Sequence, residues 1–344
     1  MFLSARRKFF GYLVAVLWML PAGASHAADA IHRVPGYVFG TEVEVAIYGG
    51  SRAEAHRLGA SVLSEFDRLH HKFHAWQPSA LTALNESIAR GETFQADADM
   101  VDMLQSATKL AERSDNLFNP ALGHLIRLWG FQSSDITVHT PAPAEIKRWV
   151  DAKPRMSDLR YDGTRISSRN KAVMLDLGGY AKGYALDRAA RLLRDAGVKA
   201  ALVNIGGNIL AIGRPGERPW KVGIRDPRGA GTVAAVDLHD NEAIGTSGDY
   251  QRYFMKDGKR HPHVIDPRSG QTIDLVASVT IITSGGTDAG LRSDGNTKPL
   301  FIVGPQHWRA MAQRLGLSEV LLIDANRKIE MTPAMRQRLA GGKE

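Results

Sequence analysis

The alternation of apolar and polar residues predicts a chain that mixes strands with helices. Residues 37–48 alternate with a period of two, which is typical of a strand. Apolar side chains recur at helical spacing over residues 52–74, and a second helix is predicted at residues 99–113. Residues 132–145 are interrupted by prolines and are predicted as a loop.

The centre of the chain carries the clearest pattern. An apolar strand predicted at residues 173–177 ends at two glycines, and a helix with alanine and leucine on its buried side then runs to Gly197. A second apolar strand follows at residues 200–205. We expect a ligand to bind at this strand–loop–helix–strand unit, because glycines let a backbone approach a ligand and helix-start amides favour phosphate.

The remaining apolar segments decide the fold class. Strands and helices do not alternate regularly, so the pattern favours an α+β fold over a doubly wound one. Residues 28–344 are enough for one large domain or two modest ones. The further strands are predicted at residues 220–225, 233–238, 250–255, 276–283, 300–303 and 320–323.

The first residues predict export. Three basic residues at positions 6–8 precede an apolar stretch at 11–20, and small residues lead to a signal peptidase site with cleavage after Ala27. The apolar stretch is shorter than the about 20 residues that a membrane-spanning helix needs. We therefore expect residues 1–27 to be a signal peptide and the mature protein to be soluble and periplasmic. Because two of the basic residues are arginines, both the general secretory and the twin-arginine routes stay open.

Composition excludes several classes of chemistry. The formal net charge is +8, but no basic run is interleaved with aromatic residues, so nucleic acid is not an expected partner. The chain has no cysteine, which excludes disulfides, iron–sulfur clusters, zinc–thiolate sites and cysteine nucleophiles. The absence of cysteine also excludes a lipid on an N-terminal cysteine, and no stable membrane anchor is expected.

Each polar motif has an ordinary structural interpretation beside a functional one. The loop Gly178–Gly183 includes Lys182 and suits a pyrophosphate, but it also suits a tight turn. Asp176, just before it, either caps backbone amides or faces a ligand. The segment His263–Gly270 is a hairpin turn, or it presents His263 as an acid, a base or a phosphate contact. Asp294 by itself is an ordinary loop acid.

A histidine cluster lies near the end of the first predicted helix. His70 and His74 share a helical face, as metal ligands can. The cluster lacks the adjacent glutamate of a zinc protease and any evident third ligand. We therefore favour a solvated helix face over a metal site.

Taken in chain order, seven short segments resemble the FAD:protein FMN transferases, the ApbE family. The resemblance extends over residues 35–325, and the order of the segments makes it specific. The segments are Phe39-Gly40-Thr41, Phe118 to Gly123, Leu128 to Phe131, Asp176 to Gly183, Val203 to Asn208, Thr246 to Tyr250 and His263 to Gly270.

The resemblance implies a fold and a reaction. The fold is a mixed, largely antiparallel sheet flanked by helices in a single compact unit. In the reaction, FAD binds with Mg²⁺, and a Thr or Ser hydroxyl of an acceptor protein attacks the phosphorus on the FMN side. AMP leaves and FMN stays attached through a phosphoester. We expect the acceptor to be an exported or membrane redox protein.

The resemblance also implies roles for individual residues. The flavin or adenosine pocket is lined by Phe39, Trp76, Leu117, Phe118 and Asn119. Asp176 contacts the adenosine, Lys182 and Ile265 contact FAD, His263 is the acid–base residue, and Mg²⁺ is held by the Gly179 carbonyl, Asp294 and Thr297.

The chain departs from its family at three positions. Lys298 stands where relatives usually have Thr or Ser, Phe39 stands where Met is common, and Asn119 stands where Asp is common. We expect Lys298 to point away so that Asp294 still binds Mg²⁺. Two functions stay open on the sequence alone: an active transferase, and an accessory protein that binds FAD without efficient transfer.

The sequence predicts a preference for FAD over FMN. Asp176 and the helix start at Gly178–Gly183 suit a dinucleotide with a pyrophosphate, which FMN lacks. Isothermal titration of the purified protein should therefore show tighter binding of FAD than of FMN. Equal affinities would contradict the predicted adenosine contact.

Overall fold

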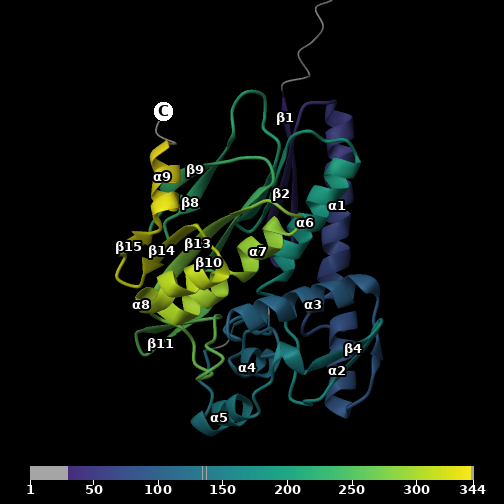
Figure 1. Cartoon of the computed structure of the whole chain (residues 1–344), viewed down its shortest axis with the longest axis vertical. Coiled ribbons are helices and arrows are strands. Elements are labelled where there is room, and N and C mark those ends of the chain that lie inside the picture. Colours follow the sequence, from purple (N-terminus) through teal and green to yellow (C-terminus); the bar gives the residue numbers. More distant parts are fainter. Residues whose placement is uncertain (1–29, 134, 137, 342–344) are drawn as a thin grey trace, which may run out of the picture.

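An antiparallel eight-stranded sheet organises the chain, with strand order β1-β2-β6-β7-β10-β13-β14-β15 (Figure 1). The computed structural model describes residues 30–341 except 134 and 137, so the predicted signal peptide at residues 1–27 lies outside the described residues. The strands are β1 (Ile31–Val38), β2 (Thr41–Tyr48), β6 (Ala201–Ile205), β7 (Asn208–Ile212), β10 (Glu242–Gly248), β13 (Val276–Ser284), β14 (Glu319–Asp324) and β15 (Ile329–Met331).

Three smaller sheets accompany it. Their strands pair in the orders β3-β5-β4, β8-β9 and β11-β12. The bounds are β3 (Phe94–Gln95), β4 (Leu159–Asp162), β5 (Arg165–Ser168), β8 (Trp220–Arg225), β9 (Thr232–Leu238), β11 (Tyr253–Lys256) and β12 (Lys259–Pro262).

Helices complete the α+β architecture. They are α1 (Arg52–Lys72), α2 (Ala80–Arg90), α3 (Ala98–Arg113), α4 (Gly123–Leu128), α5 (Pro143–Asp151), α6 (Ala181–Asp195), α7 (Ala289–Gly295), α8 (Thr297–Leu315) and α9 (Pro333–Gly341), with a short 3₁₀ turn at Met156–Asp158. Figure 1 shows α1 and α6 alongside each other, and α9 beside β9. The predicted helices at 52–74 and 99–113 correspond to α1 and α3.

Both faces of the large sheet are buried, because its strands send alternate side chains into two cores. Val45 and Ile47 of β2 join the core formed with α1, α3, α6 and α8. Ala46, between them, faces a second core under the β8–β9 hairpin and α9. A third, smaller core lies around α4 and α5. The prediction of one compact α+β unit with a largely antiparallel sheet is confirmed.

Two predicted strands near the site differ from the structure. The strand at 37–48 is a hairpin, because Phe39 and Gly40 adopt positive φ values of 56° and 69° and form the turn between β1 and β2. Residues 173–177 form only an isolated bridge, between Met174 and Leu122, and the backbone of Leu175 bonds instead to the Asn85 amide.

The strand predicted at 300–303 is wrong, because these residues belong to α8. Leu300, Phe301 and Ile302 are all buried, so the run is apolar on every side, and periodicity cannot distinguish a buried helix from a buried strand. The loop predicted at 132–145 ends earlier than expected, since α5 begins at Pro143. The strand predicted at 250–255 begins at Tyr253.

Strand β10 packs closely against α7 at Gly245. A Cβ atom at Gly245 would lie 2.2 Å from the Ser293 carbonyl oxygen, which belongs to backbone and cannot move freely. We expect Gly245→Ala to reduce the free energy of unfolding by about 1–3 kcal/mol, as overpacking does. Chemical denaturation of the variant and of the unsubstituted protein measures this difference.

Gly36→Ala is the matched control, since Gly36 also lies in a strand. A Cβ there meets only the side chain of Leu63, which can move. We expect a cost below about 1 kcal/mol, partly offset by the lower entropy of the unfolded chain. Equal costs for the two variants would contradict the packing account of Gly245.

Candidate functional site

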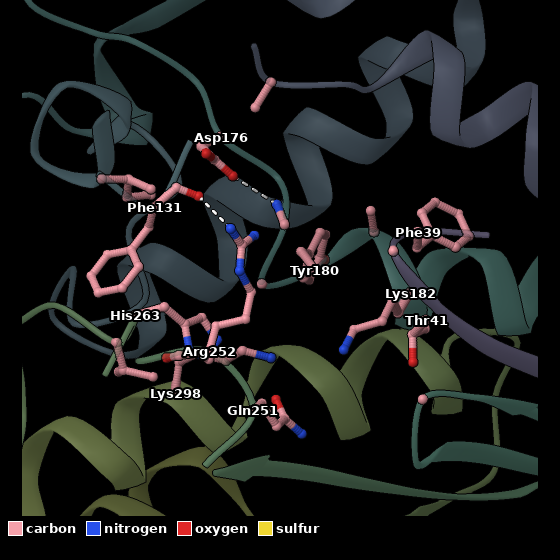
Figure 2. A pocket seen from close by; sticks show the side chains of 18 of the residues that line it. Phe39, Thr41, Phe131, Asp176, Tyr180, Lys182, Gln251, Arg252, His263 and Lys298 are labelled. Atoms are coloured by element: carbon pink, nitrogen blue, oxygen red, sulfur yellow. Dashed lines mark hydrogen bonds between the residues drawn. The ribbon is translucent and has the colours of Figure 1, made fainter. Parts of the chain in front are cut away.

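A pocket of about 810 Å³ opens where strands of the large sheet end and the loop before α6 begins (Figure 2). The turn between β6 and β7, at Gly206-Gly207, forms part of its wall. All eight residues predicted to contact FAD line this pocket, together with His263 and Gly179. Their roles stay predictions, but segments from the first hairpin to the turn after β12 converge on one space.

Aromatic side chains form one wall of the pocket. Phe39 lies at the β1–β2 turn and packs edge-on against His70, with ring centroids 5.5 Å apart. His74 packs in the same manner against Trp76 at 4.6 Å, and both histidines line the pocket. The interpretation of this cluster as a solvated helix face is therefore wrong for His70 and His74. His74 lies beyond α1, which ends at Lys72, so only His70 belongs to a helical face. On α1 the pocket face adjoins the apolar core face, and the spacing of apolar residues cannot distinguish a pocket face from a solvated one.

The neighbouring wall comes from residues 117–122. Leu117 and Phe118 are buried, and the Phe118 ring lies 5.1 Å from that of Tyr180. Asn119 donates to the Pro154 carbonyl at 2.8 Å and accepts from the Ala121 amide at 3.1 Å. The Asn119 side chain thus fixes the loop backbone as well as lining the pocket.

Asp176 both caps a backbone amide and lines the pocket, so it fulfils the structural and the ligand-facing roles that the sequence left open. Its Oδ1 accepts a hydrogen bond from the Gly178 amide at 2.9 Å, which shapes the glycine loop before α6. Its Oδ2 accepts from the Gln132 amide at 2.9 Å, and the residue lines the pocket. The carboxylate therefore holds the loop and stays within reach of a ligand.

Arg252 is a site residue that sequence reasoning missed. It lies in the pocket and donates to the carbonyls of Phe131 and Ser133 at 2.9 and 2.7 Å (Figure 2). Its guanidinium lies 5.8 Å from the Trp76 ring centroid, within cation–π range. Burial lowers its pKa. Its position two residues after the Thr246–Tyr250 segment is the one feature of the sequence that points to a role in the site.

His263 follows β12 and has a defined tautomer. Its Nδ1 lies 3.2 Å from the carbonyl oxygen of Arg252, and because a carbonyl only accepts, Nδ1 carries the proton. Nε2 therefore has a free lone pair. Burial, followed by the charges of Lys182 and Arg252, lowers the pKa of His263 to about 3. The imidazole is neutral at physiological pH, as a base must be.

Asp294 and Thr297 do not line the pocket. Asp294 is 2% exposed, and its Oδ2 accepts from the Gly183 amide of α6 at 3.0 Å. Thr297 donates to the Asp294 carbonyl at 2.7 Å and hydrogen-bonds with Ser247 at 2.7 Å. Its hydroxyl is thus engaged with protein groups.

Lys298 does not point away, so this expectation is wrong. Its ammonium forms an ion pair with Oδ1 of Asp294 and donates to the Asp294 carbonyl at 2.7 Å. The helical spacing of four residues places the two side chains next to each other. Burial, together with the charge of Lys182, lowers the pKa of Lys298, while Asp294 raises it.

The donor set at Asp294 does not fit a divalent metal. One carboxylate oxygen holds the Lys298 ammonium and the other holds the Gly183 amide. Among residues 30–341 that the structure describes, no group of three or more His, Asp or Glu side chains could hold an ion. A metal at Asp294 would have to displace the ammonium of Lys298.

Comparisons with known proteins agree with this architecture. The ApbE family model matches residues 39–322. A Rhodobacter capsulatus protein named FAD:protein FMN transferase is 40% identical over 303 residues, which span 88% of this chain and 57% of that protein. A Klebsiella pneumoniae protein of the same name is 30% identical over 94% of this chain and 93% of its own length.

Solved structures show the same fold. The ApbE protein of Thermotoga maritima aligns with a TM-score of 0.82 and 28% identity, covering 90% of this chain and 99% of that one. The Pseudomonas stutzeri flavinyl transferase ApbE aligns with a TM-score of 0.78 and 29% identity, and the alignment covers 91% of this chain and 98% of that one. This chain belongs to the ApbE family, and its predicted class, a transferase, is confirmed by these relatives.

The environment of His263 predicts its titration. A folded-state pKa near 3 lies below the ordinary value of 6.5, so the imidazole should stay neutral as the pH falls from about 8 to about 5. Nuclear magnetic resonance of ¹⁵N-histidine protein without ligand measures this, with His263→Gln identifying its signals among the 12 histidines. A midpoint near 6.5 would contradict the burial and charge that we assign to it.

Proposed function

We propose that this chain transfers FMN from FAD to a Thr or Ser hydroxyl of an exported or membrane redox protein and releases AMP. One observation carries the proposal. A single pocket brings together an aromatic wall, the start of α6 with Lys182, and the neutral imidazole of His263. The names of the relatives agree with it.

The pocket suits the parts of FAD. Its size, about 810 Å³, is that of a site for a large cofactor. The aromatic side chains of Phe39, Trp76 and Phe118, from two neighbouring walls, offer faces and edges for a ring system. Lys182 and the glycine loop before α6 offer positive charge and backbone amides to the pyrophosphate between the two ends of FAD.

The proposed step is a displacement at phosphorus. The acceptor oxygen forms a bond to the FMN-side phosphorus, and the bond from that phosphorus to the bridging oxygen breaks. AMP leaves with the bridging oxygen, and the hydroxyl proton passes to Nε2 of His263. The pyrophosphate brings negative charge next to His263 and raises its pKa, which makes the imidazole a better base.

Lysine and arginine side chains supply the countercharge in this proposal. Lys182, Arg252 and Lys298 line the pocket, and fixed positive groups stabilise charge that develops on a transferring phosphoryl group. The family resemblance implies Mg²⁺ as well, but both oxygens of Asp294 already hold protein donors. The proposed displacement therefore relies on the cationic side chains.

Residues 1–27 support the proposal that the protein works in the periplasm. Within the described part of the chain, no helix is both long and apolar enough to cross a membrane. An enzyme in the periplasm meets only acceptors in that compartment, so the proposed acceptor is an exported protein, or a membrane protein whose Thr or Ser hydroxyl faces the periplasm.

A second function has one observation in its favour. The Lys298–Asp294 pair replaces the expected metal site, and this replacement fits a protein that binds FAD without efficient transfer. Incubation with FAD and candidate acceptors, followed by mass spectrometry of the acceptor, separates the two functions. An added FMN that requires the protein supports transfer. Bound FAD with no modified acceptor supports the accessory role.

His263 provides the mutational test. His263→Ala should lower the transfer rate by about 100-fold or more, because a positioned base is lost, while FAD affinity changes little. Rates come from timed mass spectrometry and affinities from titration.

The matched control is His71→Ala. His71 lies on α1, is exposed, and does not line the pocket. Loss of the His71 side chain should leave the transfer rate and the FAD affinity unchanged. Transfer by His263→Ala at the unsubstituted rate would exclude His263 as the base.

A further inference from the structure

Lys182 and Lys298 both line the pocket. Lys298 is paired with Asp294, while Lys182 has no salt bridge or side-chain hydrogen bond to any described residue. Because both side chains are positively charged and line the same pocket, the two ammoniums repel each other. A partner-less cation beside another cation is unfavourable in a pocket unless an anion occupies it.

The Lys298 ammonium keeps one donor for a ligand. Its three N–H groups include one that donates to Oδ1 of Asp294 and one that donates to the Asp294 carbonyl. The side chain is 15% exposed and lines the pocket, so the third N–H has access to a ligand there. Asp294 therefore positions Lys298 and does not remove it from the site.

The glycine loop before α6 is shaped to admit the Lys298 side chain. A Cβ atom at Gly179 would lie 3.2 Å from Cε of Lys298, so the lysine passes directly against this glycine. The space between Gly179 and Asp294 is thus filled by the lysine stem. These are two of the three residues that the resemblance assigned to a metal.

We propose that Lys298, held by Asp294, takes the place of the divalent metal and binds the FAD pyrophosphate together with Lys182. This inference rests on the proposed function, because it assumes that FAD is the ligand. An ammonium acts at phosphate as a point charge, without ligand geometry. The consequence is an enzyme that binds FAD, and transfers FMN, without a divalent cation.

Titration of the purified chain with FAD, in excess EDTA or in Mg²⁺, tests the proposal without any substitution. We expect the two dissociation constants to agree within about twofold, and Mn²⁺ alone to show no specific binding by electron paramagnetic resonance. A tenfold or greater loss of FAD affinity in EDTA, restored by Mg²⁺, would overturn the proposal while leaving the proposed function intact.

Lys298→Thr makes the test specific. The substitution removes the ammonium and frees the Asp294 carboxylate, so FAD affinity should fall at least tenfold in EDTA and recover in Mg²⁺. Lys182→Met is the matched control, because it removes a pocket ammonium but leaves the Lys298–Asp294 pair in place. The FAD affinity of Lys182→Met should fall by the same factor in EDTA and in Mg²⁺.

The remaining outcomes are also decisive. Unchanged FAD affinity of Lys298→Thr in EDTA would overturn the role of Lys298. If Lys298→Thr fails to fold, the EDTA titration of the unsubstituted chain still decides the question. Absence of FAD binding by the unsubstituted chain, with or without Mg²⁺, would overturn the proposed function and this inference together.

Discussion

The buried carboxylate of Asp294 joins the elements on which the site depends. It lies in α7, accepts the Gly183 amide of α6, and pairs with Lys298 of α8. Asp294 is 2% exposed, and a buried charge is tolerated only when it is paired and hydrogen-bonded. Loss of the Lys298 ammonium would leave an uncompensated charge, and loss of the Gly183 amide would leave a carboxylate oxygen without its donor, so the start of α6 and the start of α8 are held to one another.

Close backbone contact makes this junction possible. A Cβ atom at Gly183 would lie 2.4 Å from the Gly290 carbonyl oxygen, so only glycine lets α6 approach α7 this closely. Asp187 of α6 accepts the amides of Gly290 and Leu291 at 2.7 and 2.8 Å, and burial raises its pKa to about 7. The glycine loop before α6 is positioned by these contacts, and with it Lys182.

Local patterns predicted much of the fold and of the pocket. Periodicity indicates long amphipathic segments such as α1, α3 and α6, and composition indicates the glycine loop before α6. Short apolar runs were misassigned, because 300–303 is apolar on every side in α8 and 173–177 bonds to Asn85 rather than to a strand. The pocket residues were assigned by family resemblance, and their convergence depends on long-range packing.

Pairing between side chains could not be predicted from the sequence. The spacing of four residues allows Lys298 to lie near Asp294. Whether the Asp294 carboxylate binds a metal or an ammonium depends on its burial and on its hydrogen bond with the Gly183 amide. Arg252 was missed for a similar reason, since its partners are the carbonyls of Phe131 and Ser133, which lie far away in the chain.

A crystal structure of the chain with FAD, grown in Mn²⁺, tests the central claim most directly, because manganese is located by its anomalous scattering. The account predicts the pyrophosphate against Lys182 and Lys298, the Lys298–Asp294 pair intact, and no anomalous peak beside Asp294. An anomalous peak bonded to Asp294, with Lys298 rotated out of the pocket, would contradict it.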